Sequence, residues 1–527
     1  MHFTTHDQLI LLALLAVLGA LLIAAPALRI PYPIFLVLGG LAMGFVPGVP
    51  TIALPPAVVL VAVLPPLLYL SAYRTSLRDL RANSRAIGIL AIGLVVATTV
   101  SVALVAHAAV DNMSWSAAFV LGAVVAPTDP IAATAIMRRL GVSRRLVSIV
   151  ESESLVNDGT ALVLYRVAIV AAVSGEFSVW DASWRFVWAI VGGVGIGLVV
   201  GFLVAELRRR VDNPPVEVTI SLMTGYFAFI PANAASASGV LAVVTAGVYL
   251  GWRTPELTSV QTRLQGEALW NIVAFVLNAL VFALVGLQLS RILDTLTGRS
   301  AGELARYGLL VTGTVIVARI LWLPVFTHVP RWLWGSTRHM KPFTHTFLIS
   351  WAGMRGAVSL AAALAIPLTT DAGGGFPERD LIIFLTFCVI LGTLVLQGLS
   401  LPALIRAMRI EPDHTEEEED ARARIRAAEA ALARLEELVG EDWVRDDTAE
   451  RLRGLYGFRV NRFASRFDGE SDGAIEEQSQ AYQRLRRELL DAERAAVTAL
   501  GRAGEISGDV VTRVRRDLDL EDARLDV

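Results

Sequence analysis

The stretch Ala126-Pro127-Thr128-Asp129-Pro130 lies halfway along an apolar run that extends from residue 114 to 137. A run of about 20 apolar residues is long enough to cross the hydrocarbon core of a bilayer as a helix. Two prolines three residues apart remove backbone N–H donors and clash with the preceding turn, so an unbroken helix cannot pass through them. The sequence therefore predicts a membrane-spanning helix that is interrupted at its middle, with Thr128 or Asp129 capping a second half that starts at Pro130.

The composition of the whole chain is typical of a membrane protein. Of the 527 residues, 54% are hydrophobic and 18% are charged, and the mean hydropathy is +0.58. These values exclude an ordinary soluble globular protein. Residues 411–527 carry 19 Lys and Arg against 30 Asp and Glu, whereas the first 410 residues carry 27 against 19. We therefore predict a transmembrane domain at 1–405 and an acidic cytosolic helical tail at 406–527.

Thirteen apolar runs have the length of a transmembrane helix. They lie near residues 8–25, 31–47, 52–71, 86–110, 114–137, 147–173, 183–206, 217–233, 237–251, 267–290, 306–327, 343–367 and 380–404. For the eighth and ninth two arrangements are open, because Pro231 and the polar stretch 233–238 could join two short spans or lie within one bent span. The fold class predicted is an all-α, multi-pass membrane protein with about 13 transmembrane helices.

The short loops between these runs alternate in charge. One set carries 17 Lys and Arg and the other set carries 5. Basic loops are retained on the cytoplasmic side of a membrane. The chain is therefore predicted to lie in the inner (cell) membrane with its N-terminus outside and its tail in the cytoplasm.

Among the ionisable residues inside the predicted spans, five stand out: Asp129, Glu153, Asp158, Arg319 and Arg355. A lone charge at the bilayer centre costs at least about 2.5 kcal/mol, so such residues usually serve a function. The broken span at Asp129 adds to this argument, because the freed carbonyls and helix ends of broken helices form cation sites in transporters.

The sixth span contains a polar turn, Glu153-Ser154-Leu155-Val156-Asn157-Asp158. Residues four apart share a helix face, so Ser154 lies with Asp158, and Glu153 lies with Asn157 on the adjacent face. A hydroxyl and a carboxylate on one face suit a hard cation such as Na⁺, which prefers oxygen ligands. The runs 147–150 and 161–164 on either side are apolar, which argues against an extramembrane helix end.

The two intramembrane arginines lie in the second half of the chain. Arg319 is deep in the eleventh span, where a guanidinium needs a carboxylate partner or a water-filled cavity. Arg355 belongs to the twelfth span, in which Gly353 and Gly356 would allow the helix to bend or unwind. A second interrupted span in the second half is typical of the inverted repeats of secondary transporters. Arg166 is nearer the outer end of its span, where extension toward the membrane surface would explain it.

On these residues the sequence resembles the monovalent cation/proton antiporter family, which includes bacterial and animal sodium/proton exchangers. The resemblance covers about the first 405 residues and is carried by Pro127-Thr128-Asp129-Pro130, Glu153-Ser154-Leu155-Val156-Asn157-Asp158 and Gly353-Met354-Arg355-Gly356. It implies a core domain built from helices at about 86–173 and 306–404, in which the fifth and twelfth helices are broken and cross. The remaining helices would form a scaffold through which two copies make a homodimer.

The resemblance also implies roles for individual residues. Asp158 would carry the cation and the proton, and Asp129, Ser154 and the Thr128 carbonyl would complete the Na⁺ site. Glu153 would pair with Arg319 and form a hydrogen bond with Asn157, and Arg355 would support the second break.

Two positions refine the expected transport. The order Asn157-Asp158 resembles the electroneutral branch of the family, whereas electrogenic members have two adjacent Asp residues there, so one proton per cation is expected. Many relatives have an acidic residue after the Pro-Pro motif of the third span, where this chain has Leu70. That departure leaves the preferred cation open among Na⁺, Li⁺ and K⁺.

Two other classes of function explain the sequence less well. A cation channel or uniporter would explain the buried acids but not a pair of broken helices. A membrane enzyme is disfavoured, because the sequence has no His-Glu-x-x-His, no Gly-x-Ser-x-Gly before a helix and no clustered Asp for Mg²⁺. The expected partners are the bilayer, a monovalent cation, the proton and a second copy of the chain, with no resident cofactor and no nucleic acid.

The tail shows a different pattern from the spans. Apolar residues recur at heptad spacing from Ile425 to Val439, and further helices are expected near 476–501 and 507–518. We expect a solvated helical tail that packs on itself or on its copy, with a sensory or partner-binding role as the alternative.

Overall fold

The computed structural model describes residues 16, 19–20, 23–24, 31–46, 58–82, 84–175, 179–294, 296, 298–328, 343–410, 415–464 and 472–523. These residues are almost entirely helical, and the only pairing of extended backbone among them is one bridge between Thr369 and Gly375. The predicted all-α class is confirmed. The chain divides into two compact units, Met1–Pro412 and Asp413–Val527.

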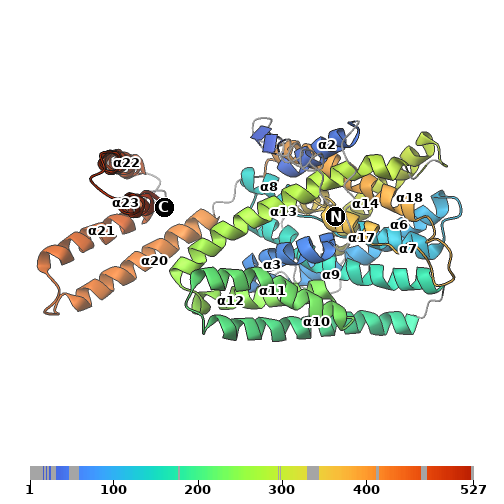
Figure 1. The fold of residues 1–527 in the computed structure, drawn as a ribbon, viewed down its shortest axis with the longest axis horizontal. Helices are drawn as coiled ribbons and strands as arrows, with labels where there is room; N and C mark the ends of the chain where they lie inside the picture. Colours follow the sequence, from blue (N-terminus) through green and yellow to red (C-terminus); the bar gives the residue numbers. More distant parts are fainter. Residues whose placement is uncertain are drawn as a thin grey trace. The chain divides into compact units, whose positions relative to one another are not determined.

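The first unit holds helices that follow the predicted spans in order (Figure 1). They are α2 (Tyr32–Gly44), η1 (Val58–Val63), α3 (Leu64–Arg74), α4 (Leu77–Ala82), α5 (Ser84–Gly88), η2 (Ile89–Leu94), α6 (Val95–Ala109), α7 (Trp115–Val125), α8 (Ile131–Arg139), α9 (Arg144–Ser174), α10 (Val179–Arg208), α11 (Pro214–Ala234), α12 (Gly239–Leu257), α13 (Val260–Asp294), α14 (Ala301–His328), α16 (Phe343–Trp351), α17 (Ala357–Leu364), α18 (Arg379–Gly392), η3 (Thr393–Gln397) and α19 (Gly398–Ala407). The η segments have the wider turns of a π-helix.

Seven helices in the described parts of the chain are long and apolar enough to cross a membrane by themselves. Other predicted spans are present as shorter pieces, such as α7 with α8 and α16 with α17. The first predicted span, 8–25, lies outside the described residues apart from a few isolated positions, so the count of thirteen stays a prediction.

The region near Pro231 forms two helices. Helix α11 ends at Ala234, and α12 begins at Gly239. The turn between them places Ser236 at a positive φ of 56°, and the Ser238 side chain accepts a hydrogen bond from the Leu241 N–H at the start of α12. The prediction of two short spans is correct here, and the single bent span is excluded.

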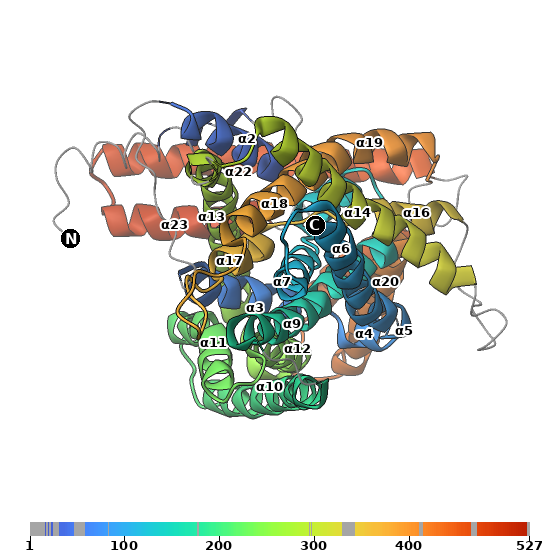
Figure 2. The same cartoon turned by 90° about the vertical axis from the view of Figure 1, so that its right-hand side faces the viewer.

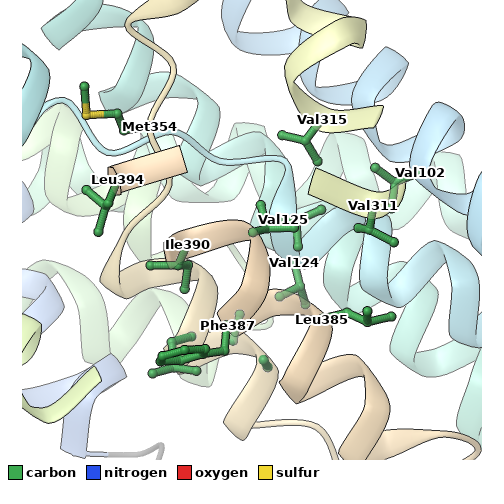
Figure 3. Close-up of a cluster of buried hydrophobic side chains, with 14 of the residues drawn as sticks. Val102, Val124, Val125, Val311, Val315, Met354, Leu385, Phe387, Ile390 and Leu394 are labelled. Carbon is green, nitrogen blue, oxygen red and sulfur yellow. The ribbon is translucent and has the colours of Figure 1, made fainter. Parts of the chain in front are cut away.

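Buried apolar side chains of this unit gather in two main clusters. The larger one joins residues of α6, α7, α8, α9, α14 and α18 with parts of α2 and α13. Figure 3 shows its interior, where Val125 at the end of α7 lies between Val315 of α14 and Ile390 of α18. The second cluster joins α3, α10, α11 and α12, and Leu155 of α9 belongs to it. In lipid such packing stabilises helices through close van der Waals contact rather than through removal of apolar surface from water.

Helix α9 connects the two clusters, and it carries the polar turn at 153–158. It contacts α7 and α17 on one side and α10 and α12 on another (Figure 2). Residues of its polar turn are therefore shielded from lipid by neighbouring helices.

The second unit contains α20 (Thr415–Leu438), α21 (Asp446–Ala464), α22 (Asp472–Arg502) and α23 (Gly508–Ala523). Helices α20 and α21 pack together, and Arg453 forms an ion pair with Glu436 at 2.8 Å across them. This contact lowers the pKa of Glu436. Helices are present where the sequence predicted them, whereas α21 was not predicted, although Asp446 and Asp447 at its first turn are a typical helix start.

Candidate ion-binding site

Two broken helices meet at the centre of the first unit. Helix α7 ends at Val125 and α8 begins at Ile131, while α16 ends at Trp351 and α17 begins at Ala357. The residues between have no regular structure, which confirms both predicted interruptions. The backbone N–H of Asp129 donates to the carbonyl of Met354 at 2.8 Å, so the two breaks lie against each other.

The carboxylate of Asp129 lies at the start of two helices. Its Oδ1 accepts a hydrogen bond from the Ile131 N–H at 2.9 Å, and its Oδ2 lies against the backbone of Gly356, directly before α17. The first turns of α8 and α17 both present unpaired N–H groups and the positive end of a helix dipole. The predicted cap at Asp129 is present, and the carboxylate also packs against the start of α17, which the sequence did not reveal.

The positively charged guanidinium of Arg355 lies at the C-terminal end of α7. Its Nη1 donates to the carbonyl of Ala126, just beyond the last turn of α7, where the negative end of the dipole lies. The Arg355 backbone N–H donates to Thr393 Oγ1 at 3.0 Å, which ties the second break to η3. Thr393 is a site residue that sequence reasoning missed, because a single threonine in an apolar span gives no signal of its own.

The predicted ion pair between Glu153 of α9 and Arg319 of α14 is present. The guanidinium nitrogens Nη1 and Nη2 lie 2.5 and 2.8 Å from the two carboxylate oxygens, and both side chains are 1% exposed. Arg319 also donates through Nε to the Ser350 carbonyl at 3.1 Å and through Nη2 to the Ile349 carbonyl at 3.1 Å. It therefore satisfies the end of α16 as well as the carboxylate of Glu153.

Ser154 and Asn157 attach α9 to the first break. Ser154 Oγ donates to the carbonyl of Thr128 at 2.7 Å, and Asn157 Nδ2 donates to the Oγ1 of Thr128 at 2.6 Å. Both contacts join residues that the sequence singled out in two separate spans. The expected hydrogen bond between Asn157 and Glu153 is wrong, because Thr128 takes the Asn157 amide while Arg319 takes Glu153.

Asp158 lies on the same face of α9 as Ser154 and is buried at 4% exposure. Its Oδ1 has no hydrogen-bond partner among the described residues, and the same holds for Oδ1 of Asn157. Asp129 and Arg355 are the charged neighbours that act on Asp158 electrostatically. A buried carboxylate oxygen without a donor is costly unless a proton or a cation occupies it. The residues present therefore fit a small cation bound by oxygen atoms.

Gly356 has a packing role that gives a test. A Cβ atom added there would collide with the carboxylate of Asp129. We expect Gly356→Ala to lower the free energy of unfolding by about 1–3 kcal/mol, since the packed break cannot take another methyl group without shifting Asp129. Thermal unfolding of the purified protein measures this, with Gly313→Ala as the control because that glycine of α14 has no neighbour in the way. Equal melting temperatures for the two variants would contradict the role assigned to Gly356.

Two further residues that the sequence singled out, Arg166 and Leu70, lie outside the breaks. Arg166 donates to Asn233 Oδ1 at 2.5 Å and to the Ala237 carbonyl at 3.1 Å. It thereby joins α9 to the turn between α11 and α12.

Leu70 is buried in the second apolar cluster and lines a cavity among α3, α10, α11, α12 and α13.

Comparison with known proteins agrees with this architecture. Residues 10–407 match the family model described as sodium/hydrogen exchanger, transmembrane. A protein of Mycobacterium tuberculosis described as an uncharacterized Na(+)/H(+) exchanger is 38% identical over 505 residues, which cover 94% of this chain and 92% of that protein. The sodium, potassium, lithium and rubidium/H(+) antiporter of Bacillus subtilis is 35% identical over 388 residues, covering 71% of this chain and 58% of that protein.

A solved structure has the same fold as the first unit. The sodium proton antiporter MjNhaP1 from Methanocaldococcus jannaschii superposes with a TM-score of 0.62 and 20% sequence identity, covering 77% of this chain and all of that one. The family match covers most of the chain and includes both broken helices and the polar turn of α9. The chain therefore belongs to the transmembrane sodium/hydrogen exchanger family, whose members are cation/proton antiporters.

Proposed function

We propose that this protein exchanges Na⁺, Li⁺ or K⁺ for H⁺, one for one, with Asp158 holding either the cation or the proton in each crossing. The single observation that carries the proposal is the buried carboxylate of Asp158, whose Oδ1 has no hydrogen-bond partner within the described residues. In the proposed site Asp129, Ser154 and the Thr128 carbonyl complete the cation's oxygen ligands.

The charges around Asp158 support a one-for-one exchange. Glu153 is neutralised by Arg319 at 2.5 Å, and Asp129 is bonded to the start of α8 and packed against Gly356 before α17. Asp158 is then the group whose charge changes during transport. An empty, ionised carboxylate is unfavourable in a low-dielectric interior, so the site crosses only when a proton or a cation neutralises it. Exchange without net charge movement follows.

We propose alternating access as the way in which the site reaches both sides. The helices around the two breaks would move as a core against a scaffold of α3, α10, α11 and α12, which form a separate apolar cluster. Two copies would associate through their scaffolds in the plasma membrane, with the tail in the cytoplasm. A contribution to pH homeostasis would follow from such exchange.

We propose that the protein accepts several monovalent cations. A Bacillus subtilis relative is named for sodium, potassium, lithium and rubidium, and Leu70 offers no carboxylate from the third span. The proposed ligands, two carboxylates, one hydroxyl and one carbonyl, are all hard oxygen donors, which suit any of these monovalent cations.

Reconstituted liposomes with an internal pH dye test the proposal. We expect outward gradients of Na⁺, Li⁺ or K⁺ to drive protons inward, with Rb⁺ as the fourth member of the panel, and to produce no current on a solid-supported membrane. If none of the four cations moves protons, the proposal fails. A cation current without proton counterflow would instead indicate a channel or uniporter.

A further inference from the structure

A cavity of about 240 Å³ lies among the scaffold helices, apart from the site at Asp158. It forms where α3, α10 and α12 end and where α11 and α13 begin. The space is far larger than the roughly 10–15 Å³ that holds one water molecule. It is therefore large enough for a ligand of several heavy atoms.

The charge of the cavity wall is mainly positive. Three arginines, Arg74, Arg208 and Arg263, line it together with one carboxylate, Glu267. Arg74 donates to Asn271 Oδ1 at 2.5 Å, and Arg263 donates to the Thr258 carbonyl at 2.7 Å. Each of these bonds uses one nitrogen of the guanidinium and fixes the orientation of its other N–H groups. Hydroxyl groups of the wall, such as that of Thr254, add further polar contacts.

Arg208 is the strongest indication of a ligand. It is 3% exposed, and its Nε and Nη1 have no hydrogen-bond partner among the described residues. Its ion pair with Glu217 has a separation of 3.9 Å, which is too long for a hydrogen bond. The other oxygen of Glu217 accepts from Thr262 Oγ1 at 3.1 Å. A buried guanidinium with two unsatisfied donors is unfavourable unless an acceptor enters the cavity.

We propose that this cavity binds a phosphate group through Arg74, Arg208 and Arg263. Guanidinium groups bind phosphate oxygens through paired, charge-assisted hydrogen bonds, and three of them around one space fit such an anion better than a neutral ligand. The phosphate belongs to either an anionic lipid headgroup or a soluble anion. Bound there, it joins the ends of five helices and stabilises the scaffold.

The experiment uses the full chain in phosphatidylcholine nanodiscs and measures the unfolding temperature. One arm adds inorganic phosphate against chloride at equal ionic strength, and the other replaces part of the lipid with phosphatidylglycerol. The test variant is R74Q/R263Q, because both residues are exposed and can be changed without leaving Glu217 unpaired. The control is R209Q/R210Q, which removes two charges at the same end of α10 that do not line the cavity.

We expect one of the two probes to raise the unfolding temperature of the wild-type protein and of the control. In R74Q/R263Q the same probe should act with an affinity weakened by about tenfold or more. A shift with inorganic phosphate identifies a soluble anion, and a shift with phosphatidylglycerol alone identifies a lipid headgroup. If neither probe shifts the wild type, or if the control loses the shift as fully as R74Q/R263Q does, the proposal is overturned.

Discussion

Asp158→Asn is expected to reduce cation-driven proton movement to the level of empty liposomes. The amide cannot release a proton, and it cannot neutralise a cation, so both halves of the exchange are lost together. The folded state should be no less stable, because the change removes a buried carboxylate oxygen that has no hydrogen-bond partner among the described residues. Proton uptake under a Na⁺ gradient and thermal unfolding of the same preparation measure the two effects.

Ser154→Ala is the matched control for this substitution. It lies on the same face of α9 and loses only the hydroxyl that donates to the Thr128 carbonyl. Loss of one such polar contact costs about 0.5–1.5 kcal/mol, so exchange should persist with a two- to tenfold weaker apparent affinity for the cation. Normal exchange in Asp158→Asn would refute the assignment of the carrier.

Arg319→Ala should be the most destabilising single change in the core. It leaves Glu153 as an unpaired carboxylate at 1% exposure and removes the donors that satisfy the Ile349 and Ser350 carbonyls. Removing one partner of a buried pair costs about 3–5 kcal/mol. The thermal unfolding midpoint and the yield of monodisperse protein in size-exclusion chromatography measure this loss.

A double variant distinguishes the stability that comes from pairing the two charges from the stability that comes from filling the space with side chains. In Glu153→Gln/Arg319→Met no charge is left unpaired, and a side chain of similar length remains in place of Arg319. We expect this variant to recover more than half of the stability that Arg319→Ala loses. A double variant as unstable as Arg319→Ala would show that the carbonyls of α16, and not Glu153, are the main partners of Arg319.

The sequence predicted the chemistry of the core well, because the bilayer penalises polar groups strongly. The prolines at 127 and 130 predicted one break, and the buried charge of Arg319 predicted a carboxylate partner or a water-filled cavity. These signals are local, or they follow from a requirement that a buried charge has a partner. The ion pair joins residues 166 positions apart; the requirement for neutrality called for a partner, and the family resemblance supplied which one.

Contacts that involve the backbone could not be predicted in the same way. The hydrogen bond from Asp129 to the Met354 carbonyl and that from Arg355 to Ala126 depend on how two distant breaks meet in space. Any carbonyl could serve, so no residue type marks the partner. The error over Asn157 has the same origin, because an amide side chain can donate to either Glu153 or Thr128 and only the packing of α9 decides.

The central claim is that a proton and a cation compete for Asp158. Its most direct test is the apparent KM for Na⁺ as a function of pH on the side to which Na⁺ is added, with the pH on the opposite side held constant. Over the pH range in which protons occupy the site, competition predicts that KM rises about tenfold for each unit of acidification, while the maximal rate at saturating Na⁺ stays constant. A KM that does not change with pH, accompanied by a falling maximal rate, would contradict the account.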